Sequence, residues 1–215
     1  MVDGMPSSVE DAKCVIGTAC VPYQDGNMVQ APSPCWAKTK TKCELVHTDI
    51  GGPLTASLGG FIDFTTALED FTGLIRATPI KTKGMALQVL KTRFMQLGTL
   101  MGVKIKRVRH DGAKEYVTDD LKAWYKDKGI TSEKTVPYKS QQNGEAEGVN
   151  CKLMERVRAA LLDAGAEGPL QDKVSASVVN MLNRSLKAGL DVTPMEALTS
   201  RRPNVVGFRT WGSRA

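Results

Sequence analysis

The sequence of 215 residues has no long hydrophobic run. A membrane-spanning helix needs about 18 or more consecutive apolar residues, and the chain has no such stretch. The first residues, MVDGMPSSVEDAK, are acidic and polar, so they do not resemble the apolar core of a secretory signal. We therefore expect an intracellular protein without membrane contact.

Cysteine is also scarce, with five residues scattered along the chain. An odd and scattered set argues against a disulfide framework. Cys14 and Cys20 are too far apart for a CxxC pair, Asp11 stands where a partner of Cys14 would fall, and no histidine precedes Cys14. The ligand set of a structural zinc site is therefore incomplete, and we predict no zinc.

The charge balance is mildly basic, with a net charge of +6 and a pI near 9.1. This excess fits a polyanionic partner such as DNA but does not establish one. The apolar fraction of 41% is sufficient for one packed domain. Composition favours a loose flank at residues 1–41, a folded core at 42–190 and a C-terminal extension at 191–215.

Hydrophobic periodicity predicts an α/β protein. Runs of β-branched and aromatic residues indicate strands at 43–50, 61–71, 74–80, 103–108 and 130–136. Helical spacing indicates helices at 83–101, 118–129, 144–164 and 170–184, with a short one after Thr193. The first three strands can form a meander, and the fourth can return parallel to the first. The prediction is a mixed five-stranded sheet with helices on both faces.

Two aspartates follow strands that this topology makes neighbours. Asp49 ends the first predicted strand and Asp111 follows the fourth. If the two strands are parallel, both carboxylates emerge at one edge of the sheet, where oxygen ligands suit a divalent cation. The alternative is that both are ordinary turn aspartates.

Glu147 favours the metal-binding interpretation. It lies near the start of the predicted helix 144–164, on the flank of its apolar stripe. A helix packed on the sheet would direct this side chain to the strand ends, and a third carboxylate permits two metal ions about 4 Å apart. The alternative is a first-turn glutamate that interacts with the helix dipole, a role that suits Glu145 better.

Several ordered segments resemble a known family. Asp111 and Glu147 are separated by 35 residues, 112–146. The other segments are ELVHTDIGGP, ALEDFTGLIRATPIKTK, RHDGAKEY, TVPYKSQQNGEAE, LNRS and TPMEAL. Over residues 43–212 the chain resembles the catalytic core of retrotransposon integrases of the Ty1/copia branch, which has an RNase H-like fold.

The resemblance implies an activity and its components. Asp49, Asp111 and Glu147 would bind two Mg²⁺ or Mn²⁺ ions, and the enzyme would join the 3′ ends of element cDNA to target DNA. It also implies a homo-oligomer that acts in the nucleus. Residues 1–41 would be the degenerate remnant of a zinc-binding module that precedes such cores.

Further residues are candidates for DNA contact. The resemblance places a polar loop beside the DNA just before Glu147, and the outer side of the long helix is basic. The candidates are Tyr138, Lys139, Gln142, Asn143, Lys152 and Arg156. For the loop pair and for the helix cations, plain solvent exposure is the alternative.

The chain departs from the family pattern A-E-R-x-N-R, because Gly148 and Cys151 replace the two arginines. Losing two cations near DNA weakens phosphate contacts. The alternative function is therefore a catalytically inactive nucleic-acid-binding relic of a transposon polyprotein. A nuclease of the wider RNase H-like group would explain the carboxylates but not the family segments.

Overall fold

The computed structural model describes residues 38–135, 144–166, 168–186, 191–209, 211 and 212, all within the unit Ala37–Ala215. The predicted flank, residues 1–41, lies almost wholly outside this part of the chain. Within the described ranges, no helix combines the length and the apolar character needed to cross a membrane.

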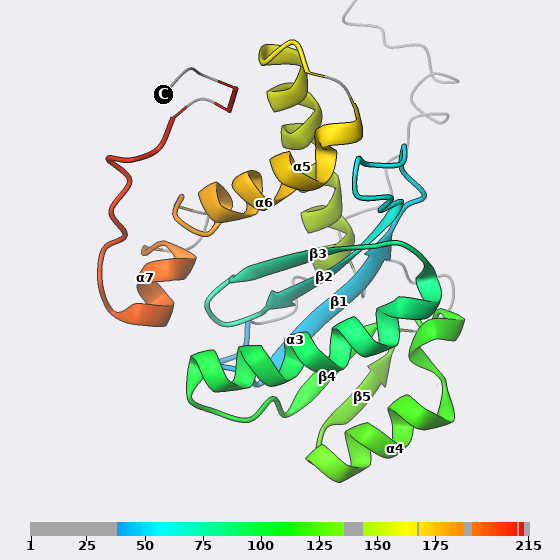
Figure 1. The fold of residues 1–215 in the computed structure, drawn as a ribbon. Coiled ribbons are helices and arrows are strands. Elements are labelled where there is room, and N and C mark those ends of the chain that lie inside the picture. The colour runs from blue at the N-terminus through cyan, green and yellow to red at the C-terminus, as the bar shows by residue number, and fades with distance from the viewer. Residues whose placement is uncertain (1–37, 136–143, 167, 187–190, 210, 213–215) are drawn as a thin grey trace, which may run out of the picture. The chain divides into compact units, whose positions relative to one another are not determined.

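One mixed sheet organises the described chain, in the spatial order β3-β2-β1-β4-β5 (Figure 1). The strands are β1 Leu45–Gly51, β2 Asp63–Glu69, β3 Ile75–Ile80, β4 Arg107–His110 and β5 Thr131–Lys134. Strands β1, β2 and β3 form an antiparallel meander, whereas β4 runs parallel to both β1 and β5. The predicted five-stranded mixed sheet is confirmed.

The bounds predicted for the fourth strand were wrong. Residues 103–108 were expected to form it, but β4 covers Arg107–His110. The N–H of Val103 donates to the carbonyl of Gly98 at 3.1 Å, which ties this residue to the end of the preceding helix. Alternating basic residues produced the strand-like pattern in a segment that serves as a helix-to-strand connection.

The helices of the described chain are α3 Ala86–Met101, α4 Asp119–Lys128, α5 Gly144–Asp163, α6 Gln171–Leu182 and α7 Pro194–Thr199, with short 3-10 turns at Lys83–Met85, Lys114–Tyr116 and Gly168–Leu170. Among them, capping residues mark both ends of α4 and the start of α7. The side chains of Thr118 and Thr193 accept hydrogen bonds from Leu121 N and Glu196 N. Gly129 ends α4 with φ of 67°, a left-handed conformation that glycine adopts without steric cost.

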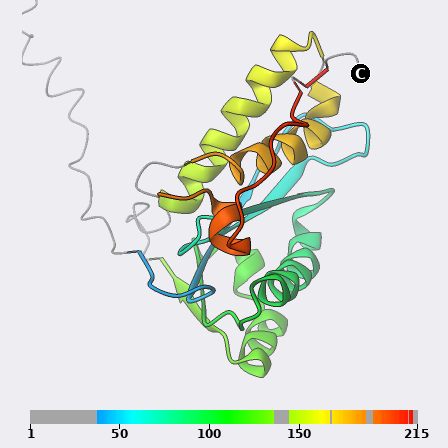
Figure 2. The same ribbon diagram turned by 90° about the vertical axis from the view of Figure 1, so that its left-hand side faces the viewer.

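Helices pack on both faces of the sheet (Figures 1 and 2). A separate hydrophobic core lies on each face. Helices α3 and α4 build one core, in which Phe94 stacks on Trp124 with ring centroids 6.4 Å apart. Helices α5 and α6 build the other against Phe64 and Leu68 of β2. Met181 of α6 is 36% exposed, and the buried residues of this helix are Val174, Val178 and Leu182.

Asn183 joins the end of α6 to the edge strand β3. Its side-chain Oδ1 accepts from Ile75 N and its Nδ2 donates to Ile75 O, both at 2.8 Å. The same residue accepts a hydrogen bond from Met195 N through its own carbonyl. These bonds hold α6 and the start of α7 against the sheet.

Candidate active site

The parallel register of β1 and β4 places the two predicted aspartates side by side. Leu45, Val46 and His47 pair with Arg107, Val108 and Arg109. Continuing this register by two residues brings Asp49 opposite Asp111, just beyond the end of β4. Asp49 and Asp111 therefore lie on neighbouring segments at the carboxyl edge of the sheet.

Glu147 approaches the same edge from α5. This helix packs on β1 and β2, and its Asn150 donates from Nδ2 to Asp49 Oδ2 at 2.8 Å. Burial, together with the negative charges of Asp111 and Glu147, raises the pKa of Asp49 to about 6, despite hydrogen bonds from Ile50 N and Asn150 that lower it. Asp111 and Glu147 both act electrostatically on the Asp49 carboxylate, so the three acids lie around the same edge of the sheet.

This donor set fits a divalent cation in chemistry. Carboxylate oxygens are hard ligands, and a bound cation would offset both the burial and the repulsion that raise the pKa of Asp49. Among the described residues, however, no three or more His, Cys, Asp or Glu side chains are already grouped to hold a metal ion. Asp111 instead accepts from Ala113 N at 2.9 Å, and Asp111 and Glu147 are both exposed.

A buried tyrosine packs beside the strand ends that carry the aspartates. Tyr116 is 1% exposed, its ring stacks on His110 at 4.7 Å, and its hydroxyl lies 3.2 Å from Thr48 Oγ1. The Thr48 hydroxyl donates its one proton to Thr66 O at 2.7 Å, so Tyr116 is the donor in their contact. Burial raises the pKa of Tyr116 well above its usual value, which keeps this donor protonated.

His110 has a structural role. Gly112 N donates to its Nδ1 at 3.0 Å, so the neutral ring carries its proton on Nε2 and donates to Ser132 Oγ at 2.9 Å. Burial lowers the pKa of His110, which favours this neutral form. Gly112 has φ of 82°, a conformation suited to glycine that turns the chain sharply after Asp111.

Sequence reasoning missed Asn150. It was not among the predicted site residues, but its side chain contacts Asp49. Its Oδ1 is buried and, among the described residues, has no hydrogen-bond partner. An amide in an otherwise apolar stripe, one turn after Glu147, was the available signal.

The predicted DNA contacts are only partly described. Tyr138, Lys139, Gln142 and Asn143 lie outside the described residues. Lys152 and Arg156 are exposed on α5. At about 100° per residue they lie roughly 140° and 180° around the helix from Glu147, so the helix turns them away from the carboxylates.

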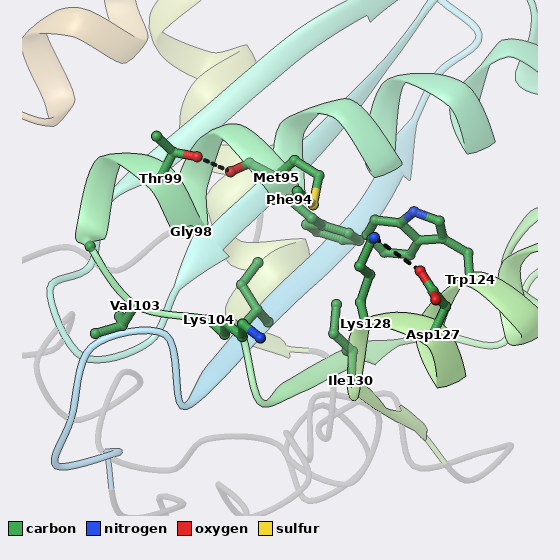
Figure 3. Close-up of a pocket in the computed structure, with 12 residues that line it drawn as sticks. Phe94, Met95, Gly98, Thr99, Val103, Lys104, Trp124, Asp127, Lys128 and Ile130 are labelled. Carbon is green, nitrogen blue, oxygen red and sulfur yellow. Dashed lines mark hydrogen bonds and ion pairs between the residues drawn. The ribbon is translucent and has the colours of Figure 1, made fainter.

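A separate hollow of about 500 Å³ lies between α3 and α4 (Figure 3). Phe94, Trp124 and Ile130 are among its lining residues. Its one acid, Asp127, forms an ion pair with Lys128 at 2.9 Å. None of the predicted site residues lines this hollow, so it is not the candidate active site.

Comparison with known proteins bears on the family and the fold of this chain. No protein-family model matches the chain. The chain is 29% identical over 174 residues to the "Retrovirus-related Pol polyprotein from transposon TNT 1-94" of Nicotiana tabacum. This match covers 80% of the chain but only 13% of the polyprotein.

Two solved structures share the fold. A chain of the simian T-cell lymphotropic virus intasome in complex with PP2A regulatory subunit B56 gamma has a TM-score of 0.65 at 15% identity, over 94% of this chain and 72% of that one. The HTLV-2 integrase catalytic core domain in complex with magnesium (trimeric form) has a TM-score of 0.55 at 13% identity, over 72% of this chain and 95% of that one. The predicted resemblance to a retrotransposon integrase core and the predicted RNase H-like fold are confirmed.

Proposed function

We propose that this chain is the catalytic domain of a retrotransposon integrase, a polynucleotidyl transferase that joins cDNA 3′ ends to target DNA. One observation carries the proposal. Asp49, Asp111 and Glu147 come from three separate segments of the chain, and on an integrase-type fold all three lie around the carboxyl ends of β1 and β4. If both aspartates only formed turns, a helix glutamate would not be expected beside them.

Each side chain has a defined part in the reaction. The three carboxylates would hold the metal, and Asn150 would orient the carboxylate of Asp49 through its amide N–H. When bound, two Mg²⁺ or Mn²⁺ ions would assist the attacking oxygen and the leaving oxygen of an in-line displacement. A bond would form between the cDNA 3′ oxygen and the target phosphorus, and the target P–O3′ bond would break, leaving a 3′ hydroxyl.

We also propose an oligomeric, DNA-bound working form. The simian virus relative was solved as an intasome, and the HTLV-2 core was solved in a trimeric form with magnesium. By the same resemblance, the chain would act on element and target DNA in the nucleus.

Strand transfer of a labelled oligonucleotide duplex with Mn²⁺ tests the proposal. The parent should yield joined products, and Glu147→Gln should reduce them to background because one metal-binding carboxylate is lost. Glu155→Gln is the matched control, since Glu155 is exposed on the same helix and two turns away. Equal product from Glu147→Gln and the parent would contradict the assignment.

A catalytically inactive nucleic-acid-binding relic is the second candidate. It is supported by the ungrouped carboxylates among the described residues and by Gly148 and Cys151, which replace arginines of the family pattern. This candidate predicts no product from the parent or either variant, with DNA binding retained by all three.

A further inference from the structure

A groove of about 520 Å³ follows α5 on the side turned away from the carboxylates. We call it the α5 groove; it lies between α5, the β2–β3 turn and the end of α6. The residues that matter for its chemistry are Lys38, Gly148, Lys152, Arg156 and Leu186. We propose that it binds the phosphodiester backbone of DNA away from the reacting phosphate, an inference that rests on the proposed integrase function.

The charges of the α5 groove favour an anionic occupant. Lys38, Lys152 and Arg156 supply three cations, against the acids Asp70 and Glu145. Asp70 is already engaged, because its carboxylate accepts from Thr39 N at 2.7 Å and contacts His47 Nε2 at 3.2 Å. In the described part of the chain, neither Lys152 nor Arg156 forms an ion pair, so both remain available to phosphates.

The shape of the groove suits a close-lying backbone. A Cβ added at Gly148 would meet nothing within 4 Å, so the helix surface there is open. Lys152 and Arg156 are one helical turn apart, which separates them by about 6 Å along the axis. This spacing is close to the rise of about 6.8 Å between phosphates two steps apart on one DNA strand. Leu186, which is 67% exposed, adds an apolar side chain to the groove that sugars or bases can contact.

The position of the groove gives it a distinct task. Strand transfer brings together two DNA molecules, whereas the carboxylate edge holds only the reacting groups. Helix α5 carries Glu147 and Asn150 on one side and Lys152 and Arg156 on the other. The α5 groove would therefore hold flanking DNA while the other side of the same helix serves the reaction.

Salt-dependent binding of a short DNA duplex, measured in EDTA so that no chemistry occurs, tests this inference. The variant Lys152→Gln/Arg156→Gln removes two groove cations. Loss of two phosphate contacts should make the slope of log K against log salt shallower by about 1.8, and the affinity should fall. The matched control is Lys122→Gln/Lys126→Gln, which removes two exposed cations from α4 and should leave the slope close to the parent value.

A second pair of variants tests the open part of the groove. Gly148→Glu adds a carboxylate where nothing lies within 4 Å and should weaken duplex binding, whereas Gly148→Gln adds similar bulk without charge. Thermal melting of each variant establishes that the fold is retained. Equal weakening by the two substitutions would overturn the electrostatic argument.

The results separate this inference from the proposed function. A groove variant with the same salt slope as the parent overturns DNA binding in the groove, whatever the strand-transfer assay shows. If a second copy of the chain occupies the groove, the double variant changes the sedimentation mass of the free protein and leaves the salt slope unchanged. That result would also overturn DNA binding in the α5 groove. Conversely, an inactive parent with a shallower slope in the groove variant retains this DNA site while rejecting catalysis.

Discussion

Replacing Asp49 with asparagine tests how much the ionised Asp49 carboxylate destabilises the metal-free protein. Burial and the charges of Asp111 and Glu147 raise the pKa of Asp49 to about 6, whereas the pKa of an unfolded aspartate is about 3.9. The stability that accompanies a raised pKa is fully present below about pH 4 and is lost as the pH rises through about 6. Near pH 7.5 the folded metal-free protein therefore carries an unfavourable ionised Asp49 that asparagine removes.

The stability gained by Asp49→Asn can be derived from the pKa shift of Asp49. About two pKa units correspond to at most roughly 3 kcal/mol. Asp49 is partly exposed, so solvent screening reduces this to about 1–2 kcal/mol. For a chain of this length that is a rise in Tm of roughly 3–6 °C for Asp49→Asn.

Thermal unfolding in EDTA, near pH 4 and near pH 7.5, measures the prediction. Asp49→Asn should gain stability only at the higher pH, and added Mg²⁺ should then stabilise the parent more than the variant. Asp163→Asn, at an exposed position near the end of α5, controls for the general loss of a negative charge. An equal change in Tm at both pH values would refute the reasoning, because it would mean that ionisation of Asp49 has no cost.

Three further predictions concern stability. Asn183→Ala should lower the free energy of unfolding in urea by about 2–3 kcal/mol, because it removes two buried hydrogen bonds to one backbone residue. Glu69→Gln should cost about 2 kcal/mol in the same assay, since the buried carboxylate accepts from three backbone N–H groups and one hydroxyl, and an amide offers only one acceptor atom. Burial raises the pKa of Asp70, but hydrogen bonds from His47 and Thr39 outweigh it and hold this pKa at about 2. In a titration of Tm, the parent should therefore lose more stability than Asp70→Asn as the pH falls from about 4 towards 2.

The sequence predicted the fold well because its local signals agree with its topology. Thr118, Gly129 and Thr193 mark helix ends through backbone chemistry that needs no distant partner. The period of apolar residues then separated strands from helices. The fourth strand was displaced because its boundary depends on hydrogen bonds at the end of α3, which a residue pattern does not contain.

The site was predicted less completely, since it depends on how elements cross. Asp49 and Asp111 follow from strand order alone, once β1 and β4 are parallel neighbours. The contact of Asn150 with Asp49 depends on where α5 lies over the sheet. The same crossing decides that Lys152 and Arg156 line a separate groove, which an exposed face of a helix cannot reveal by itself.

The two hydrogen bonds between the Asn183 amide and the backbone of Ile75 also limit how the protein can associate. Strand β3 is an edge strand, and an exposed edge is a template on which another chain can add a strand. The asparagine amide occupies the outward N–H and C=O of Ile75, and Pro79, further along β3, has no N–H to offer. Growth of the sheet by strand addition is thereby blocked at this edge, which protects the protein against one common route to aggregation.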